Sequence, residues 1–285
     1  MARPKRFKKS GNKNRSGRSE GSANREHWLF GVHAVLSAMQ NPKRIIQRII
    51  ITDEAASHHE DTINMVLEYS ELDLPGMERM SRDDISALLP EGVVHQGIAA
   101  LVSPLEETYL EDVVSEIELE DRARNKAGDD GEGRTVVLVL DQVTDPHNVG
   151  AILRSAAAFN ARAVITTDRK AAPPTGTLAK TASGALEVVP YVGVPNLVRG
   201  IEQLKRAGFW VYGLAGEGEK NLSDALPAHG KIALIMGAEG SGLRRLTREH
   251  CDMLVKLPTS EVFSVLNVSA AAAVALYETA RGADT

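Results

Sequence analysis

Short runs of β-branched and aliphatic residues recur along the second half of the chain, and they constrain its fold more than any other feature. The runs that follow Thr135 are V-V-L-V-L, A-V-I-T-T, V-V-P-Y-V, F-W-V-Y-G-L, I-A-L-I-M and M-L-V-K-L-P. Segments with a helical pattern separate most of them. Strands that alternate with helices are typical of a mainly parallel sheet with helices on both faces, so the sequence predicts an α/β domain over residues 135–285.

A shorter version of the same alternation occupies residues 27–105. The segment W-L-F-G-V-H-A-V-L-S-A-M starts as a short strand or turn and continues as an amphipathic helix. Residues 47–52 and 98–102 have the pattern of strands, and residues near 61–70 and 83–88 have that of helices. We therefore expect a second, smaller α/β domain at the N-terminal side.

Charge distinguishes the remaining segments, although the net charge of the chain is only −5. Residues 1–26 hold nine Lys or Arg and two Glu with almost no apolar residue, which predicts a disordered basic tail. This tail either contacts a polyanion such as RNA or only keeps the chain soluble. Residues 106–134 hold eleven acidic and four basic residues. We interpret them as an acidic linker whose first half can be helical and whose second half is flexible.

Two absences narrow the class of protein. No apolar run is long enough for a signal peptide or a membrane span, so we expect a cytoplasmic protein that does not contact a membrane. Cys251 is the only cysteine, which excludes an internal disulfide and a multi-cysteine zinc site. We expect no metal, and the adjacent His58 and His59 are interpreted as a solvated surface pair.

The first of three informative stretches is D-P-H-N-V-G-A-I-L-R-S-A, which begins at Asp145. Asp145 and Pro146 end the preceding strand, and Asn148 is a suitable N-cap for the helix that follows. Arg154 lies on that helix among Gly and Ala neighbours, which permit close approach of a ligand or of another backbone. An interface salt bridge and a functional role explain Arg154 equally well.

The second stretch, I-A-L-I-M-G-A-E-G-S-G-L, is a strand that ends in a glycine turn. Its spacing matches neither the dinucleotide fingerprint nor the P-loop. Glu239 disfavours phosphate and favours a neutral or cationic ligand, such as a nucleoside or a sulfonium, although the glycines could simply form a tight turn. In the third stretch, residues 257–278, Asn267 or Ser269 can cap an alanine-rich helix, for which helix propensity is the simpler explanation.

In this order, the three stretches resemble the motifs D-P-x-N-x-G-A-x-x-R-S-A, G-x-E-x-x-G-L and L-N-V-S-x-A of the SpoU-type family of RNA ribose 2′-O-methyltransferases, within the SPOUT superfamily. The resemblance covers residues 135–285 almost completely. Residues 27–105 resemble the RNA-binding domain of the branch that acts on large-subunit ribosomal RNA, a domain similar to small ribosomal proteins. The match is closest to bacterial enzymes that methylate a guanosine in the peptidyl-transferase region. One departure is Val265, where the family usually has serine.

The resemblance implies a deep trefoil knot, S-adenosylmethionine as cofactor, a homodimer, and ribosomal RNA or an assembling ribosomal particle as partner. It also implies that Arg154 assists the loss of the ribose proton, with the site held by Asn148, Glu239 and Asn267. Because a guanidinium stays protonated, we expect Arg154, oriented by Glu239, to grip an RNA phosphate so that a phosphate oxygen or water accepts the proton. The residues implied in cofactor binding are Leu214, Gly216, Ile235, Gly237, Gly240, Leu257 and Leu266. The alternatives are a transfer RNA ribose methyltransferase and a non-catalytic RNA-binding or ribosome-assembly factor.

Overall fold

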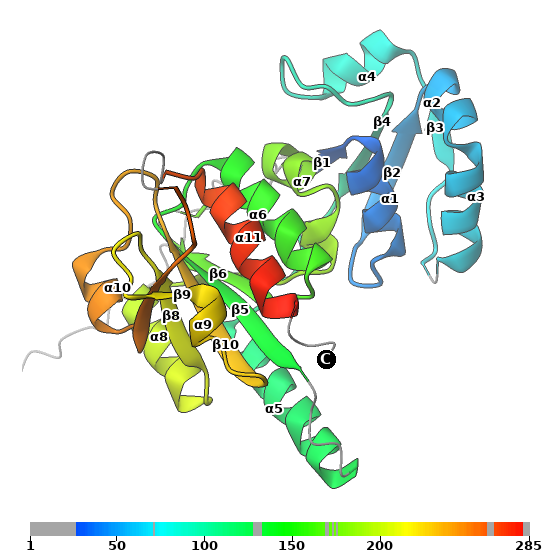
Figure 1. Ribbon diagram of the computed structural model, residues 1–285. Coiled ribbons are helices and arrows are strands. Elements are labelled where there is room, and N and C mark those ends of the chain that lie inside the picture. The colour runs from blue at the N-terminus through cyan, green and yellow to red at the C-terminus, as the bar shows by residue number, and fades with distance from the viewer. Residues whose placement is uncertain are drawn as a thin grey trace, which may run out of the picture.

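The computed structural model describes residues 27–70, 72–127, 133–168, 171–172, 174, 176–260 and 265–281. The predicted basic tail, residues 1–26, therefore lies outside the described residues. Two α/β units are present, joined by a helix that lies along the second one (Figure 1). None of the helices in the described part of the chain combines the length and the apolar character needed to cross a bilayer.

The first unit is a four-stranded mixed sheet in the order β1-β4-β2-β3, with helices packed against it. Strand β4 is antiparallel to both β1 and β2, whereas β3 is parallel to β2. Thr52 and Ser81 cap the helices that follow them, because each side chain accepts a hydrogen bond from the backbone N–H three residues ahead. The elements are β1 His27–Phe30, α1 Val32–Gln40, β2 Ile46–Ile51, α2 Asp53–His58, α3 Glu60–Tyr69, β3 Met77–Arg79, α4 Arg82–Leu88 and β4 Ile98–Val102.

Helix α5, Leu110–Ala127, occupies most of the segment interpreted as a linker. It buries Leu110, Val113 and Ile117 against the second sheet. Ion pairs from Arg162 to Glu120, at 2.6 Å, and from Lys231 to Asp121, at 2.7 Å, hold its polar side to the same unit. The helix extends to Ala127, beyond the first half of the acidic segment, and the ion pairs of Glu120 and Asp121 hold it to the second unit past its buried apolar residues.

The second unit is a seven-stranded sheet in the order β7-β6-β5-β10-β8-β11-β9, and every pair is parallel. The predicted parallel α/β domain is thereby confirmed. The run V-V-P-Y-V becomes a strand only after Pro190. The elements are β5 Arg134–Asp141, α6 Pro146–Ala158, β6 Ala163–Thr167, α7 Gly176–Ala182, η2 Ala185–Glu187, β7 Tyr191–Val194, α8 Leu197–Arg206, β8 Trp210–Leu214, β9 Lys220–Asn221, α9 Leu222–Ala225, β10 Gly230–Gly237, α10 Arg245–Glu249, β11 Met253–Lys256 and α11 Val268–Ala280.

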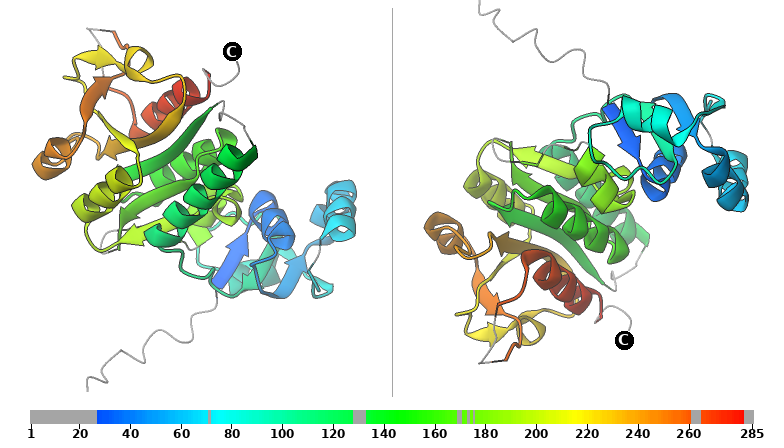
Figure 2. Two further views of the ribbon diagram at one scale, coloured as in Figure 1. Left: turned by 90° about the horizontal axis from the view of Figure 1, so that it is seen from below. Right: turned by 90° about the horizontal axis from the view of Figure 1, so that it is seen from above.

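Central strand β5 shows why both faces of this sheet are covered. Its side chains alternate, so Leu138 and Leu140 belong to the core under α6 and α11, whereas Val137 and Val139 belong to the core under α5 and α8. All four side chains are at most 1% exposed. Figure 2 shows the sheet between these two layers of helices. In the sheet, β10 lies between β5 and β8, and β11 lies between β8 and β9. The trefoil knot implied by the family resemblance stays a prediction.

Candidate active site

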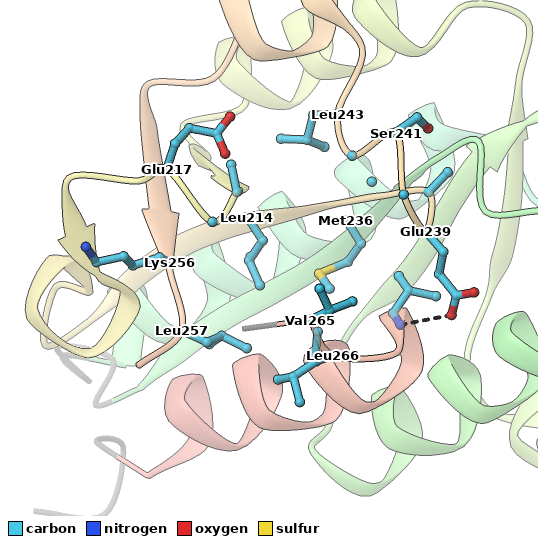
Figure 3. Close-up of a pocket in the computed structure, with 18 of the residues that line it drawn as sticks. Leu214, Glu217, Met236, Glu239, Ser241, Leu243, Lys256, Leu257, Val265 and Leu266 are labelled. Carbon is cyan, nitrogen blue, oxygen red and sulfur yellow. Dashed lines mark hydrogen bonds between the residues drawn. The ribbon is translucent and has the colours of Figure 1, made fainter. Parts of the chain in front are cut away.

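The carboxyl ends of β8, β10 and β11 and the start of α11 surround one pocket of about 390 Å³ (Figure 3). This volume lies within the range of small-molecule sites, and such sites typically lie at the carboxyl ends of parallel strands. Leu214, Met236, Leu257 and Leu266 form apolar walls. In Figure 3, Glu217 and Glu239 lie at opposite sides of the pocket, so an apolar space has an anionic group at each end.

Glycines give the loops around this pocket their shape. A Cβ on Gly237 would lie 2.5 Å from the backbone nitrogen of Leu243, which shows how tightly the turn folds back on the strand. Gly240 and Gly242 have φ angles of 77° and 61°, in the region that favours glycine. A Cβ on Gly218 would lie 2.5 Å from the carbonyl carbon of Val255, so that loop also packs on backbone. The sequence G-x-x-G-x-G therefore forms a pocket wall as well as a turn.

The structure places most of the predicted cofactor-binding residues at this pocket. Ile235 is different, because its side chain is fully buried in the core on the side of α5 and α8 and is absent from the lining. Alternation along β10 explains this result, since the next residue, Met236, reaches the pocket. The predicted residues that do line it are Leu214, Gly216, Gly237, Gly240, Leu257 and Leu266.

Three of the four predicted catalytic residues meet beside the pocket. The side-chain amide of Asn267 donates to Glu239 Oε1 at 2.7 Å and to Asn148 Oδ1 at 3.0 Å. The amide of Asn148 also donates to Glu239 Oε1, at 3.3 Å, and so does the backbone N–H of Val268, at 3.4 Å. One carboxylate thus joins α6, the turn after β10 and the start of α11. These hydrogen bonds orient both asparagines toward the carboxylate of Glu239.

The expectation that Asn148 caps α6 is wrong. Asp145 is the N-cap, because its side chain accepts from the N–H of His147 at 3.0 Å, and Pro146 starts the helix. Asn148 lies in the first turn, so its side chain is free to contact Glu239. At the other helix, Asn267 and not Ser269 is the cap, accepting from the N–H groups of residues 269 and 270. Asn267 therefore both caps α11 and binds Glu239.

Arg154 stands apart from the cluster. It lies six residues beyond Asn148 on α6 and is exposed. Among the described residues, no hydrogen bond or ion pair of its side chain is found, and Glu239 bonds to the asparagines and not to Arg154. Arg154 shares an exposed stripe of α6 with His147 and Ala158. Within a single chain, its guanidinium remains available to a ligand or to another molecule.

Sequence reasoning missed Asp141, the last residue of β5. This carboxylate is fully buried and accepts from the backbone N–H of Arg244 at 2.9 Å and from its Nε at 2.5 Å. Asp141 thereby fixes the far end of the glycine turn that lines the pocket. Its signal in the sequence was weak, because a charged residue at the end of a strand is more often exposed.

A second ion pair at the pocket also escaped the sequence reasoning. Arg248 of α10 binds the carboxylate of Glu217, and both residues line the pocket. A backbone hydrogen bond at Glu217 and the bond from Arg248 lower the pKa of this carboxyl. The three arginines of α10 and its cap thus have different partners: Asp141 for Arg244, Glu249 for Arg245 and Glu217 for Arg248.

Val265, at the family's serine position, lines the pocket and is 75% exposed, whereas Ser264 lies outside the described residues. The wall at this point is therefore apolar. Among the described residues, no cluster of three or more His, Cys, Asp or Glu side chains is arranged to hold a metal ion. The residues present fit a ligand with an apolar or aromatic body and charges of both signs, because glycine loops allow close backbone contacts and the walls hold Glu217 and Glu239 together with Arg248 and Lys256.

Comparison with known families agrees with this geometry. Residues 135–277 match the model of the SpoU rRNA Methylase family, and residues 28–108 match the model described as RNA 2'-O ribose methyltransferase substrate binding. The first match covers the seven-stranded parallel unit. The second covers the four-stranded unit and the segment leading to α5.

Curated relatives match almost the whole chain. The chain is 41% identical over 253 residues to the 23S rRNA (guanosine-2'-O-)-methyltransferase RlmB of Pseudomonas putida, covering 89% of this chain and 95% of the relative. Its identity to RlmB of Xylella fastidiosa is 37% over 262 residues, with 90% and 97% covered.

Solved structures support the same fold. The SpoU methyltransferase AviRb from Streptomyces viridochromogenes, in complex with AdoMet, superposes with a TM-score of 0.64 at 22% identity, covering 90% of this chain and 89% of that one. An AdoMet-bound rRNA methyltransferase from Sinorhizobium meliloti gives a TM-score of 0.67 at 18% identity, with 90% and 87% covered. With a family model over half of the sequence and relatives near 40% identity over most of it, the chain belongs to the SpoU rRNA methylase family.

Proposed function

We propose that the protein transfers a methyl group from S-adenosylmethionine to the ribose 2′-oxygen of a guanosine in large-subunit ribosomal RNA. The observation that carries this proposal is the hydrogen-bonded cluster of Asn148, Glu239 and Asn267 at the wall of a glycine-lined pocket. Family membership and the names of the relatives, 23S rRNA guanosine 2'-O-methyltransferases, support the same reaction and substrate.

The chemistry supplied by bound S-adenosylmethionine is an electrophilic methyl group on a positively charged sulfur. The loops after β8, β10 and β11 would hold this cofactor through backbone contacts, with Leu214, Met236 and Leu257 against its apolar parts. The pocket lies next to the Asn148–Glu239–Asn267 cluster, so the reacting ribose would be positioned there. Positioning two reactants in line accounts for much of the rate enhancement of such a displacement.

Arg154 would act on the RNA and not on the cofactor. A guanidinium stays protonated in proteins, so it cannot itself accept the ribose proton. Its planar donors suit a bidentate contact with a phosphate, which would place a phosphate oxygen or a water next to the 2′-hydroxyl. The exposed position of Arg154, without a partner among the described residues, supports a contact with bound RNA.

We further propose that the protein acts as a homodimer. Val274 and Tyr277 of α11 are 42% and 50% exposed, and Val265 and Leu266 at the pocket are also exposed. This apolar surface, together with the free side chain of Arg154, suits a second copy of the chain that completes each site. Sedimentation of the full chain tests this, with Tyr277→Glu expected to give monomers and Tyr69→Glu, a change at another exposed tyrosine, expected to leave dimers intact.

The central test is ribose methylation by the purified chain. The chain is incubated with a radioactively methylated cofactor and either ribosomal or transfer RNA, and the modified ribose is located as a gap in the alkaline cleavage ladder. We expect one position in large-subunit RNA, and a strong loss of transfer in Glu239→Gln. Methylation of transfer RNA alone would favour the hypothesis of a transfer RNA ribose methyltransferase. RNA binding without any methylation would favour a ribosome-assembly factor.

A further inference from the structure

The two domains are joined by a buried ion pair between Arg44, in the turn after α1, and Glu187, in η2. We propose that this pair is a positioning device: it holds the RNA-binding domain at a fixed orientation to the catalytic helix α6 and so selects which ribose reaches the active site. This inference rests on the proposed function for its substrate. Its structural basis is independent of that function.

Both carboxylate oxygens of Glu187 accept hydrogen bonds from the first domain. Arg44 Nη2 donates to Glu187 Oε1 at 2.6 Å, Arg44 Nε donates to Oε2 at 3.1 Å, and Asn41 Nδ2 donates to Oε2 at 2.7 Å. The side chains of Arg44 and Glu187 are only 6% and 3% exposed. Arg44 Nη1 also donates to the carbonyl oxygen of Ser103, at 2.8 Å, where the chain leaves the first domain. A bidentate, buried pair of this kind permits only one orientation of the first domain relative to the second.

Tight backbone packing surrounds the ion pair. A Cβ on Gly184 would lie 2.6 Å from Cβ of Ser37 on α1, and a Cβ on Gly176 would lie 2.9 Å from Cζ of Phe30 on β1. Ser183 and Gly184 have φ angles of 50° and 89°, so the turn between α7 and η2 adopts a backbone conformation that its packing must hold in place. The interface therefore has little freedom to slide.

Helix α7, which precedes this turn, also packs on α6, the helix with two of the proposed catalytic residues. A Cβ on Gly150 of α6 would lie 2.6 Å from Cβ of Thr181 on α7, so the two helices touch almost backbone to backbone. Helix α6 carries Asn148 and Arg154. Figures 1 and 2 show α7 between α6 and the first domain. A shift of the RNA-binding domain would consequently move its bound RNA relative to Asn148 and Arg154.

The test compares Glu187→Gln with a matched control. Breaking one partner of a buried pair is strongly destabilising, so Glu187→Gln should raise the population with an undocked first domain by about 100-fold or more. The control Glu78→Gln removes the carboxylate of an exposed bidentate pair with Arg48, inside the first domain. The double variant Arg44→Met, Glu187→Leu replaces both charges with apolar groups, which often preserves packing.

Two measurements decide between a positioning role and a merely stabilising one. Mapping of 2′-O-methyl groups should show one site for the wild type and for the Glu78→Gln control, and additional sites for the double variant, which keeps apolar packing but lacks the pair that sets the orientation. For Glu187→Gln we expect several neighbouring sites and a fall in kcat, with unchanged binding of the cofactor. Hydroxyl-radical footprints of the full chain on ribosomal RNA should likewise spread over more nucleotides in Glu187→Gln, whether or not methyl transfer occurs.

Single-site methylation by Glu187→Gln at the wild-type kcat would overturn the proposal. If the wild type itself leaves ribosomal RNA unmethylated, the proposed function fails, and the footprint alone then tests the positioning role of the ion pair. Identical footprints for the wild type and Glu187→Gln would then reject the positioning role, and a spread in Glu187→Gln that is absent from the Glu78→Gln control would support it.

Discussion

Asn267 combines two tasks that substitutions can separate. Its Oδ1 caps α11 by accepting from the N–H groups of residues 269 and 270, at 2.8 and 3.4 Å, while its Nδ2 donates to Glu239 at 2.7 Å. Serine is as good a cap as asparagine but has no amide to reach Glu239. Asn267→Ser should therefore keep the helix cap and lose activity, whereas Asn267→Ala should lose both the cap and activity.

The magnitudes follow from the two kinds of hydrogen bond. Loss of an N-cap costs about 1 kcal/mol of the free energy of unfolding, which lowers Tm by about 2 °C in a chain of this size. A hydrogen bond to a charged group contributes about 1.5 kcal/mol when it is partly exposed, as here. If that bond orients Asn148 and Glu239 in the transition state, its loss lowers the rate of methyl transfer about 10-fold.

Thermal unfolding and single-turnover methyl transfer are measured on both Asn267 variants. Asn196→Ala is the matched control, because Asn196 caps α8 by accepting from the N–H of Arg199 at 3.2 Å and is not part of the pocket lining. It should lose about 1 kcal/mol of stability, the contribution of a cap, and keep full activity. A wild-type rate for Asn267→Ser would refute the role assigned to the amide. An equal loss of activity in Asn196→Ala would attribute the effect to stability instead.

Three further predictions concern other parts of the chain. Arg154→Ala should lower methyl transfer by about 100-fold without changing cofactor affinity, measured by calorimetry, because this side chain does not line the pocket within its own chain; methylation at the wild-type rate would contradict this. Deletion of residues 1–26 should weaken RNA binding and flatten its dependence on salt, since phosphate contacts release counterions; an unchanged slope would leave the tail a solubilising segment. Burial raises the pKa of the Cys251 thiol from 9.0 to about 11, so the native chain should react slowly with iodoacetamide at pH 8 and quickly in urea. Because the native thiol holds its proton more tightly than the unfolded one, the associated stability is present below pH 9 and is lost as the pH rises toward 11; rapid alkylation of the native chain at pH 8 would contradict the burial.

Local patterns in the sequence predicted most of the strands and helices, although α2, β3 and β9 were not among them. Alternation of apolar runs and helical segments predicted the parallel sheet. The spacing of apolar side chains that distinguishes a strand from a helix is a property of neighbouring residues, so it can be recognised in the sequence. The same holds for Asn267, whose cap is formed with the residues directly after it. Six of the seven residues that the family resemblance implied in cofactor binding line the pocket, and that prediction rested on ordered motifs and not on periodicity.

Only the tertiary structure decided which side chains meet. Asn148 has a partner 91 residues away in Glu239, and Arg44 has one 143 residues away in Glu187. Local patterns made Asn148 a cap and did not single out Arg44, because helix propensity and charge at one position carry no information on a partner brought close by the path of the chain. Only the family resemblance grouped Asn148 with Glu239 and Asn267. Ile235 and Met236 differ for a related reason: both are apolar residues of one strand, and the helices that cover each face determine which of them reaches the pocket.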